Sequence, residues 1–92
     1  MSLIKVGQVI GGQGQLEVLS VGESEMRLKV LSTDSHLKRY LDVGQEYSAH
    51  KHDSQCGSHE VWEISADQMH RSSSQALIFA WDDTKAEIEL DF

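Results

Sequence analysis

The clearest strand signature in the chain is the stretch Glu25-Met26-Arg27-Leu28-Lys29-Val30. Apolar and charged residues alternate along it, and successive side chains of a β-strand point to opposite faces of the sheet. Met26, Leu28 and Val30 are therefore expected to face a core, and the charged residues between them to face water. The stretch decides the fold class, because the same period of two recurs on both sides of it.

Two strand-like segments precede this stretch. Residues 4–10 carry alternating apolar positions and end at a glycine-rich reversal over residues 11–14. Residues 16–21 form the second segment, in which the apolar phase shifts between Val18 and Leu19. Such a shift predicts a β-bulge, or a strand that is covered on both faces. Together with residues 25–30, these segments predict a meander of three strands.

Four further strand candidates follow, at residues 46–52, 59–64, 76–81 and 85–92. Residues 76–81 are apolar throughout, which predicts a central strand. In the last segment Ala86, Ile88 and Leu90 alternate with acidic residues that should form its solvent face. The polar, serine-rich residues 67–74 predict a mobile loop.

One short helix is expected near residues 34–42. The tripeptide Thr33-Asp34-Ser35 offers side chains of the kind that cap helix N-termini. The apolar residues that follow recur at helical spacing, and they are Leu37, Tyr40 and Leu41. Gly44 can then end the helix.

Strands, a helix and further strands in this order occur in OB-type barrels, although about seven strands exceed the five of that fold. A chain of 92 residues is long enough for one hydrophobic core. We therefore predict a mainly β fold, namely a small antiparallel β-barrel or rolled sheet of about seven strands with an OB-like order of elements. Residues 1–92 are expected to form a single β-rich domain.

The composition narrows the function classes. The chain has 15 acidic and 8 basic residues and a formal net charge of −7. This charge repels a phosphate backbone, so nucleic acid is not an expected partner. No segment approaches the roughly 20 apolar residues of a membrane span, and no secretory signal is visible. We expect no membrane association and a cytoplasmic location.

Chemically active side chains concentrate in residues 50–59, which contain three of the five histidines and the only cysteine. Burial predicts how this segment is arranged. If residues 46–52 pair antiparallel with residues 59–65, with His52 opposite His59, one face of the hairpin collects Tyr47, Ala49, Trp62 and Ile64. That face is apolar, as a core face must be. The outer face then brings three imidazoles within about 5 to 7 Å of one another, namely His50, His52 and His59.

This cluster offers the nitrogen and sulfur ligands that Zn²⁺ or another transition metal binds, on His50, His52, Cys56 and His59. The chain lacks the paired knuckles typical of structural zinc sites, and polar residues belong on an outer face in any case. We therefore predict no cofactor and keep transition-metal binding as the alternative. Because protonated imidazoles repel one another, a response to pH is a further form of that alternative.

Cysteine chemistry is a third class. Cys56 with His59 as its base would make a nucleophile, because a thiolate beside an imidazolium is reactive. No third residue that would orient the base is apparent, and Cys56 falls in a hairpin tip without an expected pocket. We therefore predict that the chain is not an enzyme.

We predict a small soluble, non-enzymatic binding module that acts through self-association or a protein partner. The amphipathic last strand, residues 85–92, would present a hydrogen-bonding edge, which favours a homodimer built by edge or face packing. The alternative is a metal-binding or pH-responsive domain centred on residues 50–59.

Overall fold

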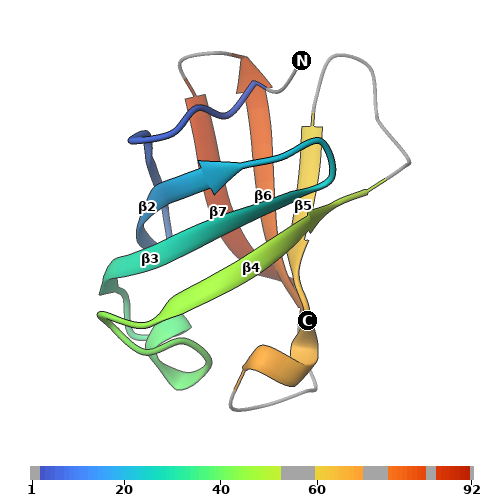
Figure 1. Ribbon diagram of the computed structural model, residues 1–92. Coiled ribbons are helices and arrows are strands. Elements are labelled where there is room, and N and C mark those ends of the chain that lie inside the picture. The colour runs from blue at the N-terminus through green and yellow to red at the C-terminus, as the bar shows by residue number, and fades with distance from the viewer. Residues whose placement is uncertain (1–2, 53–59, 70–74, 83–84, 92) are drawn as a thin grey trace.

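The computed structural model describes residues 3–52, 60–69, 75–82 and 85–91, and its strands close into a barrel (Figure 1). The order of the strands along the chain is also their order around the barrel. Among these residues the barrel has seven strands, which are β1 (Val9–Gly12), β2 (Gly14–Val21), β3 (Glu25–Thr33), β4 (Glu46–Lys51), β5 (Glu60–Ile64), β6 (Gln75–Asp82) and β7 (Lys85–Asp91). The predicted mainly β fold, a small barrel of about seven strands, is confirmed.

The barrel closes where β1 meets β7, and this pairing is parallel. Every other pair of neighbouring strands is antiparallel. Strands that alternate in direction begin and end in the same direction when their number is odd, so closing this ring joins two parallel strands. The sheet is therefore mixed rather than wholly antiparallel. Its sequential strand order also differs from the Greek-key order of the OB fold.

Both edges of β7 are hydrogen-bonded to the rest of the barrel. Its contact with β1 is close at Gly12, where an added Cβ would lie 2.5 Å from the carbonyl oxygen of Ile88. Gln13 then continues the edge, because its backbone N–H donates to Ile88 at 3.2 Å and its Oε1 accepts the N–H of Leu90 at 2.7 Å. The hydrogen-bonding edge that was expected on the last strand is therefore taken by β1, and an added strand finds little open edge on β7.

Apolar side chains fill the interior of the barrel. Met26, Leu28 and Val30 face inward with at most 1% of their surface exposed, as their alternation predicts. Tyr47 and Trp62 also face inward, with exposed fractions of 7% and 0%. The prediction that these two aromatic residues share the core is confirmed.

The phase shift predicted in the second strand is a β-bulge. The β2–β3 ladder changes register between Val18 and Ser20, which leaves Leu19 as the extra residue of β2. A second change of register lies near the start of β2, where Leu31 of β3 is the extra residue. A bulge residue has no partner directly opposite on the neighbouring strand. Both leucines are exposed, Leu19 by 36% and Leu31 by 41%.

The helix expected near residues 34–42 is only a 3₁₀ turn, η1 (Leu37–Arg39). Of the three candidate capping residues, Asp34 serves its start, because Asp34 Oδ1 accepts the backbone N–H groups of His36 and Leu37 at 2.9 and 2.8 Å. The capping signal was therefore correct, while the expectation of a longer helix was wrong.

The turn ends early because the chain bends back to the barrel. Gly44, at a φ of 88°, donates its N–H to the carbonyl of Val30 at 2.8 Å and leads directly into β4. Tyr40 and Leu41 are 6% and 1% exposed. The backbone N–H of Leu41 donates to the carbonyl of Leu37 at 3.0 Å, so the helix-like spacing corresponds to a single turn that packs onto the core.

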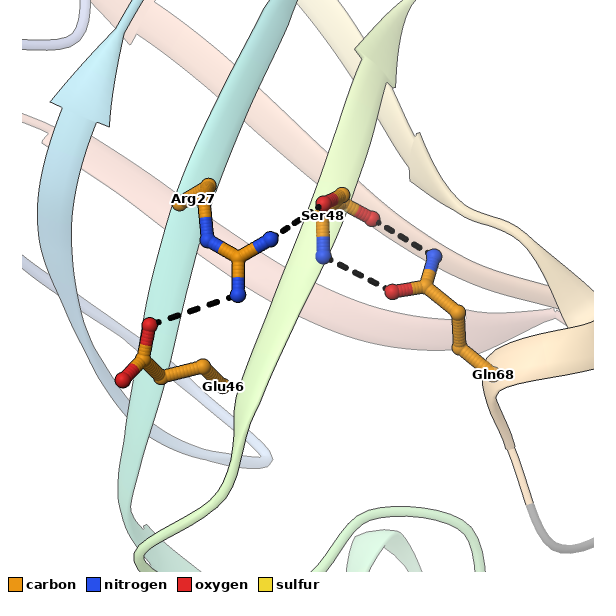
Figure 2. A network of polar contacts seen from close by, with 4 residues as sticks. All are labelled: Arg27, Glu46, Ser48 and Gln68. Carbon is orange, nitrogen blue, oxygen red and sulfur yellow. Dashed lines mark hydrogen bonds and ion pairs between the residues drawn. The ribbon is translucent and has the colours of Figure 1, made fainter.

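A second 3₁₀ turn, η2 (Ala66–Gln68), follows β5. Gln68 fastens it to β4, because its Oε1 accepts the N–H of Ser48 at 2.8 Å and its Nε2 donates to the Ser48 carbonyl at 2.9 Å (Figure 2). Met69 is buried. Residues 67–69 of the expected mobile loop are thus anchored, and residues 70–74 lie outside the described residues.

The N-terminal segment enters the barrel in a bent path, and β1 begins later than the sequence suggested. Gly7, at a φ of 88°, donates its N–H to the carbonyl of Val18 at 2.8 Å. Ile4 is 2% exposed and belongs to the core. The segment therefore lies across one end of the barrel (Figure 1). No helix in the described part of the chain is long and apolar enough to cross a membrane.

Candidate functional site

The β4–β5 hairpin, which carries the predicted metal ligands, pairs in a register two residues away from the expected one. His50 lies opposite Glu63, and the backbone N–H of His52 donates to the carbonyl of Val61 at 2.9 Å, where His59 was expected. Because side chains alternate, a shift of two residues keeps every residue on its predicted face. Among the described residues of the hairpin the predicted faces are confirmed, whereas the partner predicted for His52 was wrong.

On the outer face, His52 Nε2 lies 2.8 Å from Glu63 Oε2, and the two side chains are 35% and 28% exposed. When the carboxylate is ionised, it can only accept this hydrogen bond from Nε2–H, and no described residue bonds to Nδ1. His50 is exposed and stands two residues earlier on the same face. The two histidines of the cluster whose placement is described, His50 and His52, therefore share the outer surface.

Cys56 and His59 lie outside the described residues. Their approach to His50 and His52, and the thiol chemistry considered for them, stay predictions. Taken alone, the described residues contain no group of three or more histidine, cysteine or acidic side chains arranged to hold a metal ion.

The inner face of the same hairpin holds a carboxylate that the sequence analysis does not single out. The Glu60 side chain is only 6% exposed. Its Oε1 accepts the backbone N–H of Leu3 at 2.9 Å and lies 3.4 Å from Lys51 Nζ, while Trp62 Nε1 donates to Oε2 at 3.3 Å. Lys51 Nζ also lies 5.9 Å from the centre of the Trp62 ring. The cluster fixes the N-terminal segment, β4 and β5 relative to one another.

The sequence does contain a signal for this cluster. Glu60 is in phase with the inward-facing Trp62, and Lys51 is in phase with the inward-facing Tyr47. Charged residues are rarely buried unless they are paired. Two opposite charges at inward positions of neighbouring strands therefore predict an internal ion pair.

Exposed apolar side chains gather on the outside of β1, β2 and β3. All the large apolar side chains that are exposed in the described residues belong to this region, and they are Val6, Val9, Leu19, Leu31 and Val43, exposed by 65%, 50%, 36%, 41% and 58%. We call this set of five residues the β1–β3 wall.

Two members of the wall lie in loops but are held against its strands. Val6 lies beside β2, because the next residue, Gly7, is hydrogen-bonded to Val18. Val43 lies beside β3 in the same way, through the N–H of Gly44. The five residues of the wall therefore extend from the N-terminal segment to the turn before β4, and charged residues of β2 and β3 lie among them.

Charged residues lie in the middle of the wall. Lys29 stands between Glu17 of β2 and Glu46 of β4. Glu46 is already paired, because its Oε1 lies 3.3 Å from Arg27 Nη2, and the same guanidinium donates to Ser48 Oγ at 3.3 Å (Figure 2). Within the described part of the chain, no ion pair or hydrogen bond involves the side chain of Glu17 or Lys29.

Two shallow depressions flank the wall. One, of about 370 Å³, borders the β2–β3 turn and is lined in part by Met26 and Arg27. The other, of about 330 Å³, lies between residues 12–15 and residues 32–34. Both are open to solvent, and each lies near one of the two bulges.

Asp34, which borders the second depression, is committed to the η1 turn. The backbone N–H of Leu37, followed by the N–H and the charge of His36, holds the pKa of Asp34 below its usual range, against the opposing effect of its slight burial. A carboxylate with a lowered pKa is a weaker general base at neutral pH. The Asp34 carboxylate is therefore suited to capping and not to proton abstraction.

The described residues thus offer an outer histidine–carboxylate contact, an inner ion pair and an apolar wall. The ion pair positions the N-terminal segment, β4 and β5, whereas the other two features are polar and apolar surface. No protein-family model, no curated protein sequence and no solved structure matches the chain.

Proposed function

We propose that the chain is a small non-enzymatic interaction module that binds a second copy of itself or a protein partner through the β1–β3 wall. The supporting observation is that every exposed large apolar side chain among the described residues lies there. Exposed apolar residues scattered singly are ordinary on protein surfaces, whereas several gathered in one region favour an interaction site. Burying such a patch contributes roughly 25 cal/mol per Å² of apolar surface.

The two bulges support the same proposal. Alternation along a strand predicts polar residues at outward positions, yet both bulge positions hold leucine, at Leu19 and Leu31. Since a bulge residue lacks a cross-strand partner, no neighbouring side chain directly opposite covers it. A partner surface can therefore pack against each leucine without displacing a contact of the barrel.

The test replaces both leucines with a small polar residue, in the variant Leu19→Ser/Leu31→Ser. Sedimentation velocity over a wide range of concentration measures self-association, and affinity capture followed by titration measures a protein partner. We expect the double variant to weaken the association roughly tenfold or more, because apolar surface at the centre of the interface is lost.

The matched control is Val61→Ser/Leu77→Ser, which removes apolar surface of similar size from the half-buried outer face of β5 and β6. The control should leave the association unchanged, and circular dichroism should show both variants folded. An association that the leucine variant leaves intact would contradict the proposal.

A second candidate function, a metal-binding or pH-responsive domain, is favoured by one contact. A metal-ligating histidine usually donates its other ring N–H to a carboxylate, which orients the ring. His52 makes this kind of contact with Glu63 through Nε2, which leaves Nδ1 for a metal. Within this proposal His50, Cys56 and His59 supply the remaining ligands of a Zn²⁺ or other transition-metal site.

A further inference from the structure

We infer that the partner of the β1–β3 wall is a second copy of this chain, packed face to face about a two-fold axis that runs between β2 and β3. In this arrangement Glu17 of each copy pairs with Lys29 of the other. The inference rests on the proposed function, because it requires the wall to be a binding surface.

The charge of the chain decides where two copies can approach. A net charge of −7 makes two copies repel one another over most of their surface. The outer face of β5, β6 and β7 is acidic, with Glu63, Glu87 and Glu89 against Lys85. The wall differs, because the outward charges in the ladder positions around Lys29 are balanced, with Glu17 and Glu46 against Arg27 and Lys29.

The pairing follows from which charges are already used. Arg27 holds Glu46 at 3.3 Å. Glu17 and Lys29 face each other across β2 and β3, and neither side chain forms an ion pair or hydrogen bond in the described part of the chain. They are opposite charges at directly paired positions of neighbouring antiparallel strands.

Symmetry makes such a pair self-complementary. A two-fold axis that lies in the plane of contact, parallel to the strands and between them, exchanges the position of Glu17 with that of Lys29. Each copy then contributes one carboxylate and one ammonium to two identical inter-chain ion pairs. Val9 and the bulge leucines, Leu19 and Leu31, surround these pairs and would exclude water from them, which strengthens the attraction.

Charge-swap variants test this arrangement. Glu17→Lys and Lys29→Glu each place like charges against one another at both symmetric positions, so each variant alone should self-associate about ten- to a hundredfold more weakly than the parent chain. An equimolar mixture of the two variants should form a heterodimer, because position 17 of one then meets an opposite charge at position 29 of the other. Sedimentation velocity and native mass spectrometry measure both species.

The controls are Glu89→Lys and Lys85→Glu on β7, which change the net charge by the same amounts outside the wall. Both should associate as the parent chain does. If the mixed swap variants do not recover association while the parent chain associates through Leu19 and Leu31, the two-fold arrangement is wrong and the proposed function stands. If the parent chain stays monomeric at every concentration, the second copy is excluded, and the proposed function then stands only if a different protein binds in a manner that depends on those leucines.

Discussion

Two carboxylates on β5 contact successive residues at the end of β4, Lys51 and the following His52, on opposite faces of the sheet. Glu60 faces inward and meets Lys51 at 3.4 Å, with exposed side-chain fractions of 6% and 20%. Glu63 faces outward and meets His52 at 2.8 Å, with exposed fractions of 28% and 35%. The inner contact is longer, yet it should contribute far more to stability. Exposure, and not distance, decides the consequence of breaking each contact.

The physical reason lies in what each carboxylate leaves behind. Removal of Glu60 would leave the Lys51 ammonium, the Leu3 N–H and the Trp62 N–H facing a largely dry interior, and an unsatisfied buried polar group is destabilising. Removal of Glu63 would leave His52 in contact with water. The inner contact should therefore contribute to the stability of the fold. The outer contact should contribute little to it, so a change there can alter binding without unfolding the chain.

The largest expected effect is that of Glu60→Ala. We expect it to lower the free energy of unfolding by about 3 kcal/mol, because it breaks a buried ion pair by removing one partner. Urea unfolding followed by tryptophan fluorescence measures the change. Glu63→Ala, the same substitution three residues along the strand, is the control and should lower it by about 0.5 kcal/mol. Equal losses for the two variants would overturn the comparison between the faces.

Asp34 extends this comparison, because it is an exposed carboxylate whose hydrogen bonds come from backbone amides. We expect Asp34→Ala to lower the free energy of unfolding by about 1 kcal/mol at neutral pH, through loss of the cap on η1. The pKa of Asp34 is lowered in the folded chain by the N–H of Leu37 and then by His36. A lowered pKa in the folded state adds stability above the pKa of the unfolded state, and this stability is lost as pH falls through the folded-state pKa.

The difference between the parent chain and Asp34→Ala should therefore shrink as the pH falls below the ordinary aspartate range, near about 4. Thermal unfolding at a series of pH values between neutral and acidic conditions measures it. Asp42→Ala removes a carboxylate just beyond the same turn, and its stability at each pH should be compared with that of Asp34→Ala. A difference that grows on acidification would contradict the capping role assigned to Asp34.

The smallest expected effect on stability is that of His52→Ala, at about 0.5 kcal/mol or less without metal, because the contact with Glu63 is exposed. The same variant tests whether the outer face serves metal binding. Under that proposal, Zn²⁺ raises the melting temperature of untagged protein, and His52→Ala removes the rise. His36→Ala, on an exposed histidine outside the hairpin, should keep it. No stoichiometric binding of Zn²⁺, Ni²⁺ or Cu²⁺ by the parent chain would remove the metal proposal.

Much of the fold was predictable because it depends on neighbouring residues in the chain. The shift of apolar phase at Val18 and Leu19 predicted a bulge, and the bulge is present. The shared inner face of Tyr47 and Trp62 was predicted from alternation and is confirmed. The register of that hairpin was not predictable, because a shift of two residues leaves every side chain on the same face and so leaves the burial pattern unchanged.

In the candidate site, too, the face on which a residue lies was predictable and its contacts were not. The outward position of His50 and His52 followed from alternation, whereas the contact of His52 with Glu63 depends on the register and the rotamers. Alternation also places Glu60 and Lys51 at inward positions, whereas the contact of Glu60 with Leu3 does not follow from it. Leu3 reaches Glu60 across 57 positions of the chain, which no local pattern indicates.

The sequence by itself determined which faces of the strands are apolar, where a strand must bulge, and that Asp34 caps a turn, because these properties depend on residues close together in the chain. Only the tertiary structure decided that β1 closes the barrel on β7, that Gln13 completes the edge at Leu90, and that the exposed valines and leucines form one wall. These features join residues far apart in sequence. They depend on how many strands fit around the core and on which hydrogen-bonding groups remain to be paired when the ring closes.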